Sequence, residues 1–125
     1  MCNQFEKSEK YILKAVETSS NRSPELAYEN LGLCALATEN IDKSEAYFRK
    51  ALDIKAELPR SLYELGMIYF DKQDYLRSRA FIERLHALGY TRPSLQLAIK
   101  VEQALGAEDL ADKYTKLLKE KYPDL

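Results

Sequence analysis

The sequence predicts an all-α protein built from repeated pairs of helices, and three observations support this fold class. Only four glycines and four prolines interrupt the 125 residues, which favours helices over strands joined by turns. The stretch FEKSEKYILKAVE at 5–17 returns, with its order of polar and apolar residues kept, as IDKSEAYFRKALD at 41–53. A Leu-Gly pair at 31–32 recurs in the next part of the chain at 65–66.

The spacing of these two Leu-Gly pairs is the period of the tetratricopeptide repeat, about 34 residues, whose pattern is W-x2-L-G-x2-Y, then A-x3-F, then P. The segments that match this pattern are 28–35 with 44–48, and 62–69 with 78–82. A third match is 94–101, for which the A-x3-F part starts at either Leu110 or Ala111. Leu110 keeps an aromatic residue four positions on and Ala111 keeps the small side chain, so both registers stay open. We expect a right-handed superhelix of about three and a half helix-turn-helix repeats in a single domain, with a half repeat at 1–24 and full repeats at 25–58, 59–90 and 91–125.

The expected helices have their own start and stop signals. Pro24, Pro59 and Pro93 suit the first turn of a helix, where the missing N–H is not needed. Gly89 suits the end of a helix, and Gly106 lies in a turn. Helices are expected at 5–18, 25–37, 41–54, 59–71, 75–88, 93–105 and 108–121.

Two glycines inside helices predict close packing within each repeat. Gly32 and Gly66 each cost a helix about 1 kcal/mol relative to alanine. The cost is tolerable if the missing side chain lets the paired helices approach closely, with the small Ser44 and Ser78 facing the approach. A repeat of this kind cannot bury its apolar face alone, so we expect it to stack on its neighbours.

Residues 5–17 match the second helix of a repeat, yet only residues 1–4 precede them. We expect the chain to be part of a longer protein, and helix 5–18 to fray or to be sheltered by another copy of the chain through self-association. We also expect Cys2 and Cys34 to be free thiols, with Cys34 packed as a small apolar residue, although a disulfide in an oxidising compartment stays open. Cys2 fits an ordinary helix position better than a lipid anchor.

Charge and hydropathy argue against two classes of partner. Nineteen basic and twenty acidic residues are interleaved and leave a net charge of -1, whereas nucleic-acid binding needs a concentrated basic face. The apolar runs are far shorter than the roughly 20 residues that span a membrane. We therefore expect no nucleic-acid partner and no insertion of this segment into a membrane.

Three segments stand out beyond the general repeat pattern: YENLGLCAL at 28–36, EAYFRKAL at 45–52 and SLQLAIKVEQALGAEDLADKYTKLLKEKYPDL at 94–125. In these segments the chain resembles one family in particular, the type IV pilus biogenesis and stability lipoproteins of the PilF/PilW kind. The resemblance covers essentially all of the chain but only the later part of the family's longer array. The resemblance implies a binding protein, anchored by lipid at the periplasmic face of the outer membrane, that assists secretin assembly or pilus stability. A signal peptide and a lipobox are not visible, which departs from the family.

Two other functions stay open: a cytoplasmic tetratricopeptide adaptor unrelated to pili, and a helical domain severed from a multidomain enzyme. The residues themselves do not predict an enzyme, because no Gly-rich phosphate loop, nucleophile elbow or HExxH motif occurs. His86 is the only histidine, so a histidine-based metal site lacks co-ligands. We expect no catalytic residue, no metal and no cofactor.

Tetratricopeptide arrays bind partners through a concave surface, made mainly of first-helix positions that packing does not use. In the register above these are Glu29, Leu33, Arg60, Tyr63, Met67, Phe70, Leu95 and Ile99, with Leu36 and Glu102 beside them. Tyr63, Met67 and Phe70 fall at i, i+4 and i+7 and predict an apolar strip for a peptide or helix. Phe70 could instead pack against the next repeat. The partner implied by the resemblance is a secretin subunit or another pilus component. A chaperone's terminal carboxylate is disfavoured, because the acid and largely apolar groups at the corresponding places cannot clamp it.

Overall fold

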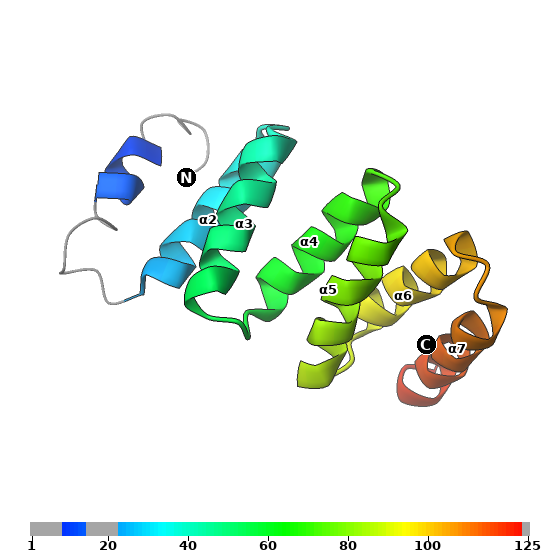
Figure 1. The fold of residues 1–125 in the computed structure, drawn as a ribbon. Coiled ribbons are helices and arrows are strands. Elements are labelled where there is room, and N and C mark those ends of the chain that lie inside the picture. Colours follow the sequence, from blue (N-terminus) through cyan, green and yellow to red (C-terminus); the bar gives the residue numbers. More distant parts are fainter. Residues whose placement is uncertain (1–8, 15–22, 124–125) are drawn as a thin grey trace. The chain divides into compact units, whose positions relative to one another are not determined.

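The computed structural model describes residues 9–14 and 23–123, and these residues form helices joined by short turns, without a strand (Figure 1). Residues 9–14 are helical, and the labelled helices follow them. These are α2 (Pro24–Ala37), α3 (Ile41–Ile54), α4 (Pro59–Asp71), α5 (Tyr75–Leu88), α6 (Arg92–Ala104) and α7 (Glu108–Lys121). The chain divides between Ser61 and Leu62 into two compact units, each with its own apolar cluster.

The helices from α2 to α7 begin and end within one residue of their predicted bounds, because residues at the helix ends favour starting or stopping there. Asn40 and Asp74 cap α3 and α5, since each side chain accepts a hydrogen bond from the backbone N–H three residues on, at 3.4 and 3.3 Å. At the start of α6, Thr91 and Ser94 bond to each other's backbone N–H in a capping box. Within the described ranges, no helix is long and apolar enough to cross a membrane.

The three turns between paired helices share one geometry. The residue before each second helix's cap is left-handed, with φ of 62° at Glu39, 64° at Gln73 and 74° at Gly106. In each turn the following backbone N–H donates to the carbonyl five residues before it. These bonds run from Asn40 to Ala35 at 2.8 Å, from Asp74 to Tyr69 at 2.8 Å and from Ala107 to Glu102 at 2.9 Å. Residues 35, 69 and 102 are therefore equivalent places in three successive repeats.

This equivalence decides the register that the sequence left open. Helices α6 and α7 have the same lengths as α4 and α5, respectively. The start of α6 follows the start of α4 by the same number of residues as the start of α7 follows that of α5, and this number is one smaller than the spacing from Ser44 to Ser78. Ala111 consequently takes the place of Ser78 and is buried, whereas Leu110 is 37% exposed. The predicted alignment of 94–101 with the Leu-Gly motif is wrong by one residue.

Within each of the first two full repeats, the paired helices approach as predicted. A Cβ atom added to Gly32 of α2 would lie 2.8 Å from the ring of Phe48 in α3. The buried Ser44 hydroxyl donates to the Gly32 carbonyl at 2.8 Å, and at the equivalent place of the next repeat Ser78 donates to the Gly66 carbonyl at 2.7 Å. The small residues thus allow contact between helix backbones and also join them.

Residues 9–14 belong to the first unit, where Ile12 and Leu13 pack against the buried cluster of α2 and α3. The Glu9 carboxylate accepts a hydrogen bond from Lys43 Nζ at 3.0 Å and another from the Tyr47 hydroxyl. Burial raises the pKa of Glu9, but the bonds from Tyr47 and Lys43 outweigh it and hold that pKa below its ordinary value. The rest of the predicted helix 5–18 lies outside the described residues.

Cys34 is buried in the cluster of the first unit, beside Leu31 and Ala35. It is disulfide-bonded, so the expectation of a free thiol at this position is wrong. Cys2, the other cysteine of the chain, lies outside the described residues. The prediction that Cys2 occupies an ordinary helix position and is not a lipid anchor therefore stays a prediction.

Candidate functional site

The predicted apolar strip lies on α4, in the second unit. Met67 is its most accessible member, with 36% of its surface exposed, and Tyr63 and Phe70 are half-buried. Tyr63 and Phe70 pack against the cluster formed by Ile82 of α5 with Leu97, Ala98 and Val101 of α6. The Phe70 ring also lies 5.5 Å from that of Tyr75, centroid to centroid. Packing therefore takes much of Phe70, and Met67 offers the most surface to a partner.

Three of the predicted site residues, Glu29, Leu33 and Arg60, lie in the first unit, and their environments differ from one another. The Glu29 carboxylate accepts hydrogen bonds from the Ser61 backbone N–H at 3.1 Å and from the Ser61 hydroxyl at 2.7 Å. Glu29 thereby ties α2 to the first turn of α4, where a negative charge is favourable. Leu33 is half-buried and Arg60 is exposed. The polar group of Glu29 is therefore already committed to the fold.

The one-residue shift in α6 changes the site residues of the last repeat. Leu95 has no exposed surface, because it takes the place of Leu62 in the seam between helices. Its assignment to a binding surface is corrected to a core position. Ile99 is half-buried and takes the place of Gly66.

The surface places equivalent to Tyr63, Met67 and Phe70 are occupied in α6 by Gln96, Lys100 and Gln103, all of them exposed. Sequence reasoning missed these three because Leu97-Ala98 imitates the Leu-Gly motif. A signal that could have found them is the Ser-Leu pair at 61–62, which recurs at 94–95.

Glu102, which was expected beside the surface, is instead a buried partner of Arg79. Arg79 Nε on α5 donates to Glu102 Oε2 on α6 at 3.0 Å, and a second guanidinium nitrogen contacts the other oxygen. Glu102 is only 3% exposed. This two-bond pair stabilises the contact between α5 and α6 and engages both oxygens of the Glu102 carboxylate.

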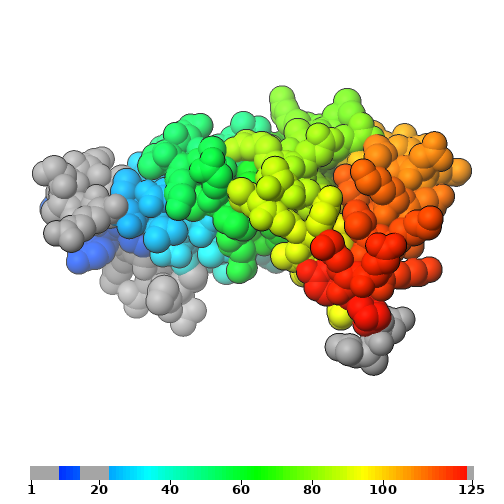
Figure 2. All heavy atoms as spheres, turned by 90° about the horizontal axis from the view of Figure 1, so that it is seen from below, coloured from blue at the N-terminus to red at the C-terminus, as the bar shows by residue number. Residues whose placement is uncertain are grey.

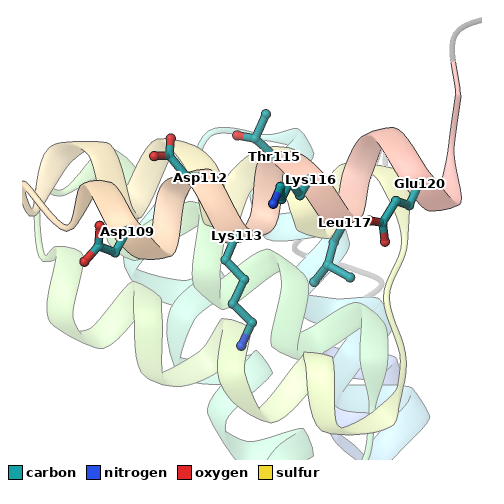
Figure 3. A pocket seen from close by; sticks show the side chains of 7 residues that line it. All are labelled: Asp109, Asp112, Lys113, Thr115, Lys116, Leu117 and Glu120. Atoms are coloured by element: carbon teal, nitrogen blue, oxygen red, sulfur yellow. The ribbon is translucent and has the colours of Figure 1, made fainter.

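A hollow of about 760 Å³ lies on α7 and is lined by one helix alone (Figure 3). Its lining residues are Asp109, Asp112, Lys113, Thr115, Lys116, Leu117 and Glu120. Acids and lysines alternate there at a spacing of four, which is typical of a solvated helix face. Across the described part of the chain, no three His, Cys, Asp or Glu side chains gather where a metal ion could be held.

Comparison with known proteins supports the architecture of repeated helix pairs described above. The tetratricopeptide repeat family matches residues 26–58 and 59–85. The crystal structure of PilW, a widely conserved type IV pilus biogenesis factor, superposes with a TM-score of 0.81 at 20% identity, over 99% of this chain and 59% of PilW. The fold is the tetratricopeptide-repeat fold. The structure of Pseudomonas aeruginosa PilF shares this tetratricopeptide fold, with a TM-score of 0.81 over 97% of this chain and 55% of that one.

In sequence, the type IV pilus assembly protein PilF of Pseudomonas aeruginosa is 24% identical over 121 residues, which are 96% of this tetratricopeptide chain and 48% of PilF. The anaphase-promoting complex subunit CDC16 of Saccharomyces cerevisiae is 28% identical over 97 residues, 75% of this chain but 12% of that subunit. The resemblance to PilF and PilW is therefore confirmed. This chain spans about half the length of the pilus protein that it matches.

Proposed function

We propose that this chain is a protein-interaction scaffold in type IV pilus biogenesis, and that it assists assembly of the outer-membrane secretin or stability of the pilus. The observation that carries the proposal is the similarity to PilF, which extends over 96% of the chain in sequence and 97% in fold. The chain acts by binding and is not an enzyme. Two acids expected at the surface, Glu29 and Glu102, bond to Ser61 and Arg79.

The partner contacts the surface of α4 and α6 in the second unit. These helices are neighbours, since a Cβ atom at Gly66 of α4 would lie 3.4 Å from Leu97 of α6. Tyr63 and Met67 give α4 an apolar edge, while Gln96, Lys100 and Gln103 give α6 hydrogen-bonding and cationic groups. The partner segment that fits has apolar side chains on one side and amide or acidic groups on the other. A secretin subunit or another pilus component supplies it.

The proposed location is the periplasmic face of the outer membrane. The disulfide at Cys34 supports this location, because disulfides persist in oxidising compartments such as the periplasm and are rare in the cytoplasm. The similarity to PilF supports it as well.

Photo-crosslinking in the source bacterium tests the proposal. A benzophenone amino acid replaces Met67 in one variant and Leu76 of α5, which is 65% exposed, in the control. We expect the Met67 variant to crosslink to a secretin subunit or another pilus component, and the Leu76 variant to give far less of that product. Crosslinks from Met67 to cytoplasmic proteins alone would instead support an adaptor unrelated to pili.

A second test uses surface piliation as its readout. Met67→Glu places a charge on the apolar edge without disturbing the core, because Met67 is exposed. We expect it to reduce surface pili by about tenfold, as follows from a loss of about 1.4 kcal/mol in partner binding. Leu76→Glu, the matched control, leaves piliation unchanged. Equal piliation in both variants would contradict the assignment of this surface.

A further inference from the structure

His86 lies near the end of α5, where α6 and α7 meet it. Its Nε2 is 3.1 Å from the Ser94 hydroxyl of α6, and its ring lies 4.7 Å from the Tyr90 ring and 5.4 Å from the Tyr114 ring of α7. The other ring nitrogen, Nδ1, is buried and has no hydrogen-bond partner. These four residues are called the His86 cluster below.

The bonds of Ser94 determine which nitrogen of His86 carries the proton. The Ser94 hydroxyl donates to the Thr91 carbonyl at 3.0 Å and accepts from the Thr91 backbone N–H at 3.0 Å. A hydroxyl has one proton to donate, so toward His86 it can only accept. Neutral His86 is thereby assigned a proton on Nε2 and a bare lone pair on Nδ1.

A second proton on His86 would therefore enter a site that is not built for it. The new N–H at Nδ1 would be buried without an acceptor. Burial lowers the pKa of His86 below its usual range.

The charged groups around the His86 cluster do not compensate for that proton. Burial, followed by the charges of Glu102 and Glu83, raises the pKa of Tyr114, so this tyrosine stays neutral. Glu102 is already paired with Arg79. The Lys121 ammonium lies 5.6 Å from the Tyr90 ring centroid and adds positive charge on that side.

The cluster also lies where α7 is fastened to the rest of its unit. The Tyr122 hydroxyl, just past α7, donates to the Tyr90 carbonyl at 3.0 Å, and the Arg92 guanidinium lies 5.6 Å from the Tyr122 ring centroid. Figure 2 shows α7, in orange and red, against the yellow segment that ends α5 and begins α6. A change at His86 therefore acts on the seam between α7 and its neighbours.

We propose that the His86 cluster is an acid-sensitive latch: a second proton on His86 loosens α7 from α5 and α6. The direction in which pH changes the stability of the seam follows from the preference of the folded state for neutral histidine. The seam keeps its full stability above about pH 6.5, where unfolded histidine is also neutral, and loses stability as the pH falls below that value. Leu52, buried at the equivalent place in α3, has no titrating group.

The full chain permits a direct test because His86 is its only histidine. NMR titration of the imidazole carbon and nitrogen signals is expected to give a midpoint below about 6.5, with Nε2–H as the neutral tautomer. Each unit below about 6.5 corresponds to about a tenfold rise in opening of the seam at acid pH. A midpoint at or above that value, or the opposite tautomer, would overturn the proposal.

Hydrogen exchange, corrected for the intrinsic effect of pH, tests the structural consequence. Between about pH 7.5 and 5.5, on either side of the ordinary histidine pKa, we expect amides of α7 to lose protection while those of α2 and α3 keep theirs. In His86→Leu, which copies Leu52, the acid-dependent loss disappears, and His86→Gln serves the same comparison if the leucine variant folds poorly. An equal loss in the wild type and in the variant would overturn the latch.

Discussion

At the scale of single residues, the two helix glycines illustrate how the same motif carries different constraints. At Gly32 the space for a side chain is filled by the ring of Phe48, whose nearest atoms would be 2.8 Å from an added Cβ. At Gly66 the nearest atom is 3.2 Å away and belongs to the branched aliphatic chain of Ile82. The rigid ring cannot yield as a methylene can, so the two glycines differ in how strictly they are required.

This difference predicts opposite results for one substitution. Gly32→Ala gains about 1 kcal/mol of helix propensity but overpacks against Phe48, and we expect a net loss of about 1–2 kcal/mol in the free energy of unfolding. Gly66→Ala should be neutral or stabilising by up to about 1 kcal/mol. Urea denaturation of both variants measures this. A larger loss for Gly66→Ala than for Gly32→Ala would show that the packing argument fails.

At the scale of helices, the sequence was sufficient to place α2 to α7 but not to align α6. The proline starts and the glycine at 89 are local signals that operate where they were predicted, and the structure adds side-chain caps at Asn40 and Asp74. The alignment of α6 depends on which side chains face a neighbouring helix, and the local sequence imitated the wrong answer at Leu97-Ala98. The surface residues of the last repeat therefore could not be predicted, whereas those of α4 were placed on one helix as predicted.

The pair between α5 and α6 gives a prediction at this scale. Arg79→Ala leaves the Glu102 carboxylate buried and unpaired, and we expect a loss of about 3 kcal/mol in the free energy of unfolding. Adding Glu102→Leu to Arg79→Ala should recover much of this, because the equivalent places hold Ala35 and Tyr69. Chemical denaturation of the single and double variants provides the measurement.

The control for this pair is Arg84→Ala, which removes an exposed guanidinium lying 5.4 Å from the Phe81 ring centroid. We expect a loss within about 1 kcal/mol. If Arg79→Ala cost no more than this control, the buried pair would not be a significant contributor to the α5–α6 contact.

At the scale of the whole molecule, the repeated hairpin and the likeness to pilus proteins could be recognised from periodicity and from three quoted segments. The disulfide at Cys34 could not be recognised in this way, because the neighbours of Cys34 in the sequence are apolar and predict only that it is buried. A disulfide depends on a meeting of residues distant in sequence, which periodicity does not encode.

The disulfide makes the location of the protein testable. We expect protein recovered from its native compartment, trapped with acid and alkylated without reductant, to show no free thiol, because an oxidising compartment preserves the bond at Cys34. Mass spectrometry then counts two alkylated cysteines after reduction. Free thiols in the trapped, unreduced protein would argue for a reducing compartment and against the periplasm.

In each repeat a small residue on one helix faces a larger side chain on its partner, and this limits how helices from different repeats can be recombined. Where α2 and α4 have glycine, α3 and α5 have Phe48 and Ile82, and where α6 has Ile99, α7 has the smaller Thr115. A chimaera that grafted α3 onto α6 would set an aromatic ring against a branched chain, and one that joined α2 to α7 would leave a void. Recombination, in the laboratory or in evolution, should therefore move whole hairpins, with crossovers falling in the loops between them.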